Sequence, residues 1–580
     1  MEYQSENITC QNCKKDFTIE PDDFSFYEKI KVPPPTFCFD CRVQRRMMFR
    51  NERSMYKRNN NAPEKDEQII SIHKPELPVT VYDDRTWWSD KWDPMDYGKE
   101  YYFSRPFFEQ FKDLYRNIPL ISLSVTNNVN CSYCNVSEGD KSCYMLSGSE
   151  HNEDTIYGNR VVENKQSGDL YVAFENELCY ELVNCTKCYR TLFSTNSQEC
   201  VDSYFLLNCK NCADCIGCVN LRNQSNCIFN KKYEKSEFER IKKELNLDTR
   251  EGLDLFEKSF KDFCTTQFFK YVNNLKAENS TGDNLVGVAR SENIFDMQES
   301  EDLKNCFWGM KVKDSYDSGP GIGMSELIYE VLDVLGSGTR FSNVIYYSFD
   351  VQYSINCHSS KHIFGCYGLR SKQYCILNKQ YSKEEYEALV PKIIEHMNNM
   401  AYIDTKGRVF AYGEFFPYDI SPFAYNETIA QEYFPLTESE AKEKGFDWYI
   451  RAERNYNITI NTESIPEKIE EVNDSFINEI IECKSKGDEI KQCTQAFRIT
   501  SQELALYRKL NIPLPQYCYN CRHYNRLQKR NPMKLWHREC MCNKSNHTHQ
   551  GKCKIEFETS YAPERPEIVY CEKCYQQEVY

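Results

Sequence analysis

The chain has 580 residues, which is more than one hydrophobic core usually supports, so we expect about three to five folded units. Its 72 basic and 87 acidic residues give a formal charge of -15, which argues against a protein that coats nucleic acid along its whole surface. Hydrophobic residues make up 40% of the chain and aromatic residues 14%, which is enough to build cores and excludes wholesale disorder.

The sequence has no signal for export or membrane insertion. MEYQSENITC has no basic or apolar leader region, and no run of about eighteen apolar residues occurs in the chain. We therefore expect a soluble, cytoplasmic protein without membrane contact. Because that compartment is reducing, we expect the 30 cysteines to be zinc ligands or small buried side chains, and we expect no disulfide bonds in the middle of the chain.

The first cysteines of the chain have the spacing of a structural zinc site. Two residues separate Cys10 from Cys13, two separate Cys38 from Cys41, and twenty-four lie between the pairs. Four thiolates on two such knuckles satisfy tetrahedral Zn²⁺. We predict a zinc-ribbon or treble-clef module, with a short helix that begins at Pro21 between the knuckles.

A basic segment, RVQRRMMFRNERSMYKR over residues 42–58, follows the second knuckle and holds seven basic residues against one acid. We expect it to form a helix. Arginine predominates, and its planar guanidinium suits phosphate contact and base stacking. The candidate nucleic-acid ligands here are Arg42, Arg45, Arg46, Arg50 and Arg53. The equal alternative is that these side chains pair with the acidic body of the same protein.

Residues 89–120 are predicted to be a junction. WWSDKWDPMDYG, residues 87–98, places three aspartates among three tryptophans, as a sugar-binding site could. No nucleophile motif, phosphate loop or metal triad accompanies it. A packed domain junction is therefore the preferred interpretation.

Two regions, residues 121–244 and 279–400, contain cysteines that recur every nine residues. The spacing links Cys134 with Cys143, Cys179 with Cys188, Cys200 with Cys209, Cys218 and Cys227, and Cys357 with Cys366 and Cys375. With β-forming residues between Asn, Ser and Gly, this period predicts half of a coil of about eighteen residues in a β-solenoid. We expect these cysteines to fill the interior and not to bind metal.

The two solenoid regions are copies of each other. Residues 208–239 match residues 356–387 at a constant offset of 148. Each copy runs into a predicted capping helix, opened by Ser236 or Ser382, which closes the open end of the stack. Residues 245–278 between the copies are predicted to be a helical connector.

The chain ends in a second copy of the N-terminal module, at an offset of 480. Cys493, Cys518 and Cys521 repeat three of the ligands, and Cys483 is our choice for the fourth. The helix between the knuckles should begin with the capping box at Thr500.

A second zinc site is predicted only in this C-terminal copy. At an offset of 488, Cys571 and Cys574 stand where the N-terminal copy has Asp83 and Thr86. For the other two ligands we favour Cys540 and Cys553. Cys542 is the third candidate for these two positions, and the reserves are His537, His547 and His549. All-thiolate sites leave no open coordination position, so we expect two or three structural zinc ions per chain and no catalytic one.

The second knuckle of this copy is also followed by a basic segment, RHYNRLQKRNPMKLWHR over residues 522–538. It holds six basic residues and no acid, so the two segments together carry +12 and the remainder carries -27, from -15 minus 12. Its candidate nucleic-acid ligands are Arg522, Arg526 and Arg530. Positive charge is therefore concentrated after the zinc knuckles.

Six stretches carry a resemblance that covers nearly the whole chain. They are FRNERSMYKR, WWSDKWDPMDYG, SRPFFEQF, CIFNKKY, GEFFPYDISPFAYNET and YAPERPEIVYCEKCYQQEVY. Through them the chain resembles an uncharacterised zinc-ribbon and cysteine-rich β-solenoid family of bacteria of the candidate-phyla-radiation type. The termini are similar to treble-clef zinc ribbons, some of which place an arginine-rich helix on ribosomal RNA. The resemblance implies no activity.

Together these features predict a mixed α+β, multidomain fold, with duplicated zinc modules at both ends flanking two β-solenoids with capping helices. The predicted segments are residues 1–88, 89–120, 121–244, 245–278, 279–400, 401–475, an aromatic and acidic connector, and 476–580. The predicted function is that of a non-enzymatic zinc protein that contacts RNA, the ribosome or DNA through its arginine-rich segments. The alternatives are a protein-binding scaffold and a carbohydrate-active β-solenoid enzyme.

Overall fold

The computed structural model describes residues 3–451 and 456–579 and divides the chain into two compact units. The first unit contains residues 1–122, 272–449 and 533–535, and the second contains residues 123–271, 450–532 and 536–580. Each unit therefore contains one cysteine-rich terminal module and one of the two repeat regions. The mixed α+β character predicted from the sequence is confirmed.

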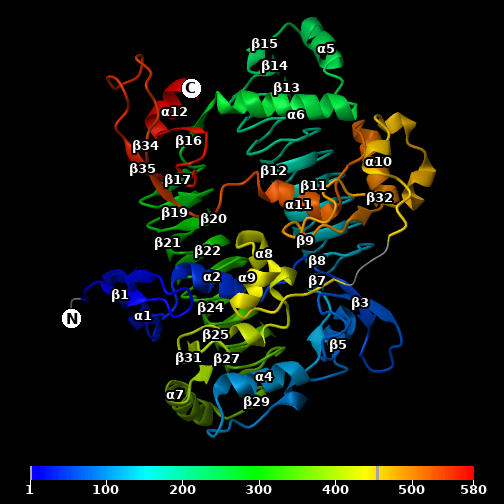
Figure 1. Cartoon of the computed structure of the whole chain (residues 1–580). Helices are drawn as coiled ribbons and strands as arrows, with labels where there is room; N and C mark the ends of the chain where they lie inside the picture. Colours follow the sequence, from blue (N-terminus) through cyan, green and yellow to red (C-terminus); the bar gives the residue numbers. More distant parts are fainter. Residues whose placement is uncertain (1–2, 452–455, 580) are drawn as a thin grey trace. The chain divides into compact units, whose positions relative to one another are not determined.

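The repeat region of the second unit is a stack of parallel strands (Figure 1). Its strands are β7 (Val125–Thr126), β8 (Asn135–Glu138), β9 (Tyr144–Glu150), β10 (Ile156–Val162), β11 (Gly168–Phe174), β12 (Tyr180–Thr186), β13 (Ala213–Ile216) and β14 (Ser225–Ile228), closed by the short antiparallel β15 (Lys231–Lys232). Ile156 pairs with Gly168, and Gly168 with Tyr180. Single bridges such as Tyr189 with Val201 continue this offset between the longer strands. Twelve residues therefore separate each strand from its partner.

The expectation of eighteen-residue coils is wrong, because paired strands lie twelve residues apart. Within each turn the backbone repeats at every third residue. Asp154, Tyr157 and Arg160 have φ values of 48°, 55° and 57°, in the left-handed region. Buried side chains also recur at every third position, as at Cys179 and Leu182, both 0% exposed. The sequence period of nine is three such steps, and the pairing period of twelve is four.

A column of polar side chains lies inside this stack, one residue from each turn. Asn152 Nδ2 donates to Asp140 Oδ1 at 2.9 Å, Asn164 Nδ2 to Asn152 Oδ1 at 3.0 Å, and Asn176 Nδ2 to Asn164 Oδ1 at 2.9 Å. The same Oδ1 atoms accept the backbone N–H of the next turn, and the N–H of Cys188 ends the series. Because each buried amide is bonded above and below, the column fixes the register of the turns.

The first unit contains a second parallel stack of similar form. Its strands are β17 (Leu275–Glu278), β18 (Gly282–Asp283), β19 (Val286–Ala289), β20 (Ile294–Gln298), β21 (Glu301–Lys304), β22 (Phe307–Tyr316), β23 (Ile322–Glu326), β24 (Leu332–Arg340), β25 (Asn343–Gln352), β26 (Ile355–His358), β27 (Lys361–Phe364) and β28 (Gln373–Ile376), closed by the short antiparallel β29 (Lys379–Gln380). Phe295 pairs with Phe307 twelve residues on, but Gly309 pairs with Ile322 and Val334 with Ile345. The turn from Gly309 to Ile322 is thus one residue longer than the usual twelve, and the turn from Val334 to Ile345 is one residue shorter.

The helices that follow the stacks agree with the prediction in part. α7 (Lys383–Asn399) begins with the expected capping box, in which the Ser382 hydroxyl accepts from the N–H of Glu385. α5 (Lys235–Glu244) begins one residue before Ser236, which therefore is not its cap. The connector forms α6 (Arg250–Thr265) and then the strand β16 (Phe268–Lys270), so its last part is not helical.

The two terminal modules have matching elements. In the first unit these are β1 (Glu6–Thr9), β2 (Asp16–Ile19), α1 (Pro21–Ile30), α2 (Phe39–Met47), β3 (Tyr56–Asn59), β4 (Gln68–Ser71), β5 (Val81–Tyr82) and α3 (Asp84–Trp88). In the second unit they are β32 (Ile481–Glu482), β33 (Ala496–Phe497), α10 (Ser501–Leu510), α11 (Tyr519–Leu527), β34 (Trp536–Glu539), β35 (Glu556–Thr559), β36 (Ile568–Tyr570) and α12 (Glu572–Val579). Each basic segment is helical only at its start, since α2 ends at Met47 and α11 at Leu527.

The remaining elements are short. They are η1 (Pro94–Tyr97), α4 (Phe107–Asn117), β6 (Leu120–Ile121), β30 (Tyr402–Ile403), β31 (Val409–Phe410), η2 (Tyr418–Ile420), η3 (Tyr425–Glu427), α8 (Ala430–Tyr433), α9 (Glu438–Glu443), η4 (Thr462–Ser464), η5 (Ile469–Glu471) and η6 (Asp474–Asn478). Among the described residues, no helix is both long and apolar enough to cross a membrane.

The buried cysteines of the stacks lead to the first prediction. Cys209 and Cys218 are both 0% exposed, and neither falls in a metal-competent cluster of the described residues. Cys209→Ala and Cys218→Ala should each lower the unfolding free energy by about 1 kcal/mol, because only a buried sulfur is lost. Denaturant unfolding and zinc analysis of the same samples measure this. The zinc content should stay unchanged, whereas the control Cys518→Ala should lower it.

Candidate metal centres

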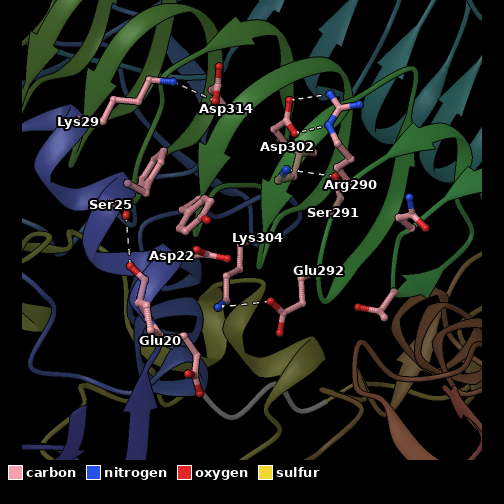
Figure 2. A pocket seen from close by; sticks show the side chains of 16 residues that line it. Glu20, Asp22, Ser25, Lys29, Arg290, Ser291, Glu292, Asp302, Lys304 and Asp314 are labelled. Carbon is pink, nitrogen blue, oxygen red and sulfur yellow. Dashed lines mark hydrogen bonds and ion pairs between the residues drawn. The ribbon is translucent and has the colours of Figure 1, made fainter. Parts of the chain in front are cut away.

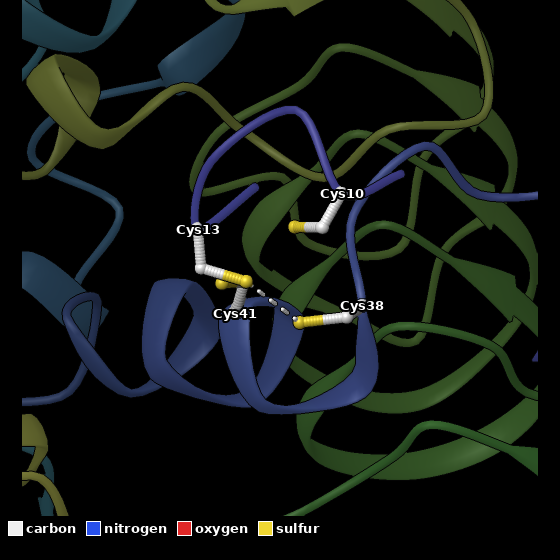
Figure 3. A group of neighbouring side chains, drawn as sticks. All are labelled: Cys10, Cys13, Cys38 and Cys41. Carbon is white, nitrogen blue, oxygen red and sulfur yellow. Dashed lines mark hydrogen bonds between the residues drawn. The ribbon is translucent and has the colours of Figure 1, made fainter. Parts of the chain in front are cut away.

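The N-terminal cysteines form one compact group (Figure 3). The sulfurs of Cys10, Cys13, Cys38 and Cys41 all lie within 4.8 Å of one another. Cys10 and Cys13 come from the turn between β1 and β2, Cys38 is the N-cap of α2, and Cys41 lies in its first turn. Asn12 Nδ2 donates to Cys41 Sγ at 3.2 Å. This donor and the helix N-terminus both favour the thiolate form that a metal requires.

The C-terminal module repeats this group with one altered ligand. The structure brings Cys483, Cys493, Cys518 and Cys521 within 4.8 Å of one another. Cys518 is the N-cap of α11, and its N–H donates to Cys483 Sγ at 3.2 Å. A hydrogen bond with the Cys483 thiol lowers the pKa of Cys493 to about 7. The longer loop between Cys483 and Cys493 thus replaces the two-residue knuckle of the N-terminal copy.

A third all-cysteine group contains Cys540, Cys553, Cys571 and Cys574, the set that we favoured. All four are buried, and the N–H of Cys571 donates to Cys540 Sγ at 3.2 Å. Cys540 follows β34, and Cys571 and Cys574 lie at the start of α12. A metal ion bound by this group would connect the beginning of the last helix to the β34–β35 hairpin.

At the equivalent position the N-terminal copy begins its helix with a side-chain cap in place of cysteines. Asp83 is the N-cap of α3, and its Oδ1 accepts the N–H of Thr86 at 3.0 Å. Asn60 Nδ2 donates to the other oxygen of Asp83 at 2.8 Å. Positions 83 and 86, which hold two cysteine ligands in the C-terminal copy, here form a side-chain helix cap.

Each of the three groups offers four sulfurs and no position for a substrate. Such closed sets are typical of structural zinc, whereas catalytic zinc keeps an open position. The cysteine clusters at both ends of the chain are thus able to bind metal ions. Their chemistry is that of a fold-stabilising site.

The arginines that follow the first group are buried against carboxylates of the same unit. Arg42 Nη1 lies 2.7 Å from Asp317 Oδ2 and 3.0 Å from the Tyr329 hydroxyl. Arg45 Nη2 lies 3.1 Å from Glu330 Oε2 and 3.0 Å from Glu414 Oε2. Burial raises the pKa of Asp317, while the facing guanidinium of Arg42 opposes the shift.

The second unit repeats this arrangement. Arg522 pairs with Asp169, donates to the Tyr507 hydroxyl at 2.8 Å and lies 3.1 Å from Glu503 Oε1. Arg526 Nη1 lies 2.6 Å from Asp169 Oδ1 and 3.1 Å from Glu181 Oε1. Arg522 and Arg526 are 4% and 0% exposed, so these ion pairs are shielded from solvent.

The two arrangements are related by both internal duplications. Arg42 and Arg522 differ by the module offset of 480, and Asp317 and Asp169 differ by the stack offset of 148. The duplicated object is therefore a module together with the stack that it contacts. The offset of 148 relates the two acids to each other, but the sequence does not show that either one faces an arginine.

All eight arginines predicted to contact nucleic acid have partners within their own unit. Ion pairs with carboxylates involve Arg42, Arg45, Arg46, Arg50, Arg53, Arg522 and Arg526. Arg530 lies over the Tyr171 ring, 5.6 Å from its centroid. The structure thus supports the second of the two alternatives, pairing with the acidic body of the same chain.

The tryptophan-rich segment 87–98 is a packed junction. Trp87 is 0% exposed and its Nε1 donates to the Pro119 carbonyl at 3.1 Å, while Trp92 Nε1 donates to the Trp87 carbonyl at 2.8 Å. Asp93 caps η1 by accepting from the N–H of Met95. Trp87, Trp92 and Asp93 are therefore engaged in local structure.

A polar cavity of about 780 Å³ lies between α1 and strands of the first unit's stack (Figure 2). Its cations are already paired: Lys29 with Asp314 at 3.0 Å and Arg290 with Asp302 at 2.7 Å. The hydroxyls of Ser25 and Ser291 donate to backbone carbonyls. The lining therefore contains no serine activated by a neighbouring base.

Comparison with known protein families finds no family model that matches the chain, and comparison with curated proteins finds no similar sequence. The family resemblance noted from the sequence stays a prediction.

The buried pairs lead to the second prediction. Arg42→Leu should lower the unfolding free energy of the first unit by about 3–5 kcal/mol, because Asp317 is left buried without its partner. The double variant Arg42→Leu/Asp317→Leu should recover much of that loss, since both charges are removed. Denaturant unfolding measures both.

The matched control is Arg240→Leu, which breaks an ion pair with Glu244 whose side chains are each 59% exposed. It should cost less than about 1 kcal/mol. An Arg42 variant as mild as this control would show that the buried pair does not anchor the module.

Proposed function

We propose that this protein is a non-enzymatic zinc-binding scaffold made of two similar units. In each unit zinc holds a terminal treble-clef-like module, and the module's arginines hold a β-solenoid whose coils are twelve residues long. The observation that carries the proposal is the closed, all-thiolate character of the three cysteine groups. They can stabilise a fold but offer no site for a reacting molecule.

The regular faces of the stacks support a role in protein binding. In the second unit, residues that pair across successive turns form a column in which Lys141, Glu153, Lys165 and Glu177 alternate in charge. The column then continues to Tyr189, which is 39% exposed. A ladder of alternating charge that continues into the exposed side chains of Tyr189 and Val201 suits a complementary protein surface.

Nucleic-acid contact, the other prediction from the sequence, has no comparable support. Its candidate ligands lie against carboxylates and a tyrosine ring of the same unit. Phosphate binding would require these buried pairs to open and would leave the acids unpaired. The carbohydrate-enzyme alternative likewise lacks an open stacking face on Trp87 and Trp92, because both rings are buried.

The third prediction concerns metal content. Reduced, freshly purified protein should contain at least three zinc ions per chain, one for each all-cysteine group. Chelation should lower the melting temperature, because the modules lose the bonds that position their helices. Elemental analysis and thermal unfolding measure this. Less than one zinc per chain would contradict the proposal.

The fourth prediction separates the scaffold from a nucleic-acid binder. Replacing Arg45, Arg46, Arg50 and Arg53 with Gln should lower the melting temperature, since buried carboxylates lose their partners. The affinity of the variant for RNA or DNA should equal that of the wild type. Binding titrations at several salt concentrations measure this.

A matched control keeps the same change in charge. In this control, four exposed lysines of the same module are replaced with Gln. They are Lys14, Lys15, Lys57 and Lys65. This control should leave the melting temperature nearly unchanged. The opposite pattern, with intact stability and a flatter salt dependence in the arginine variant alone, would favour nucleic-acid binding over the scaffold.

A further inference from the structure

A second group of metal-ligating side chains shares one cysteine with the last all-cysteine group. The ligand atoms of Cys542, His547, His549 and Cys574 lie within 4.8 Å of one another. Cys574 also belongs to the group with Cys540, Cys553 and Cys571. Two complete tetrahedral sets therefore meet at one sulfur.

The orientation of His547 is that of a metal ligand. Its Nδ1 lies 3.2 Å from Cys542 Sγ, and its Nε2 lies 2.8 Å from Glu578 Oε1. A carboxylate on Nε2 holds the proton there and leaves the Nδ1 lone pair directed at the cysteines. Glu578 lies four residues after Cys574 on α12, on the same helix face. The helix thus supplies both a ligand and the group that orients a second ligand.

His549 presents its other nitrogen to the same centre. Its Nδ1 lies 2.8 Å from the Gly551 carbonyl, which can only accept, so Nδ1 carries the proton. Its Nε2 is buried and, within the described part of the chain, has no hydrogen-bond partner. A buried lone pair without a partner is unfavourable, and a metal ion would satisfy it.

We propose that Cys542, His547, His549 and Cys574 bind a further zinc ion, and that Cys574 Sγ bridges it to the ion of the neighbouring all-cysteine group. Two sulfurs and two imidazole nitrogens are a common structural zinc set. Two ions that share one sulfur at about 2.3 Å each can be at most about 4.6 Å apart. Five thiolates against two divalent ions leave a charge of -1, which offsets the repulsion between the ions. Binding requires the cysteine thiols to release their protons to solvent.

This inference rests on the proposed zinc-binding function but is tested separately by zinc analysis of the full-length, reduced chain. Wild-type protein should hold four ions, one for each metal-competent group. His549→Gln should hold three, and Cys574→Ser should lose two. His537→Gln is the matched control, because His537 is exposed and pairs with Glu556 and Glu558, and it should keep all four.

The outcomes separate the two proposals. Three ions in the wild type, all retained in His549→Gln, would overturn the additional site and leave the scaffold proposal intact. Protein without zinc would instead contradict the scaffold proposal itself. Loss of a single ion in Cys574→Ser, with four in the wild type, would show two sites without a bridge.

Cobalt substitution of the wild-type chain avoids any dependence on variants that fold poorly. Two Co²⁺ ions joined by one thiolate couple magnetically, so the electron paramagnetic resonance intensity should fall below that expected from total bound cobalt. Full intensity from four bound ions would exclude the bridge. Glu578→Gln should speed the release of one ion to a chelator by about 10–100-fold, because the imidazole of His547 loses its orienting carboxylate.

Discussion

The buried pair between an arginine of the zinc module and an aspartate of the parallel stack is the contact on which each unit depends. In the first unit it joins Arg42 to Asp317, which are 275 residues apart in sequence. Taking both charges out of water is costly, so the pair stabilises the unit only where its geometry is fixed in advance. The proposed zinc site would supply that geometry, because Cys38 belongs to the metal-competent group and is the N-cap of α2, and Arg42 lies one turn further along the same helix. Metal binding and docking of the module would then be coupled, because Asp317 would be buried alone without the helix.

Both units use this coupling, although each is assembled from distant parts of the chain. The N-terminal module contacts the second repeat region, and the C-terminal module contacts the first, with 353 residues between Arg522 and Asp169. Closing such separations costs chain entropy before any contact forms, and folding through distant contacts is slow. The stacks reduce this cost because their own contacts are local, twelve residues apart from one turn to the next. A stack can thus form first and present its aspartate to the terminal module, which on our proposal is folded by zinc.

The sequence revealed the features that depend on local spacing and missed those that depend on pairing. Cys10 and Cys38 could be assigned because zinc knuckles have short, fixed spacings, and α1 and α10 could be located from Pro21 and Thr500. The repeat length was misjudged because inward positions recur every third residue, so cysteines nine residues apart lie three sides apart and not one full turn of twelve residues apart. The partners of the arginines were not identified, because an outward aspartate such as Asp169 resembles any other polar residue of the repeat until the tertiary contact is known.

The duplicated modules also show that a metal ion and a helix cap are alternative solutions to one structural problem. Both copies must start a helix after a short strand, at α3 and at α12. The N-terminal copy does so with Asp83, whose carboxylate binds the N–H of Thr86 at 3.0 Å. The C-terminal copy has Cys571 and Cys574 at those positions, within a cluster of thiols. A cap contributes about 1 kcal/mol and needs only its own helix, whereas a zinc site contributes far more but couples the helix to every other ligand. If the proposed site binds metal, the C-terminal module depends on it at a point where the N-terminal module uses a helix cap, and the metal ties the last helix to the β34–β35 hairpin, next to which Cys540 and Cys553 lie.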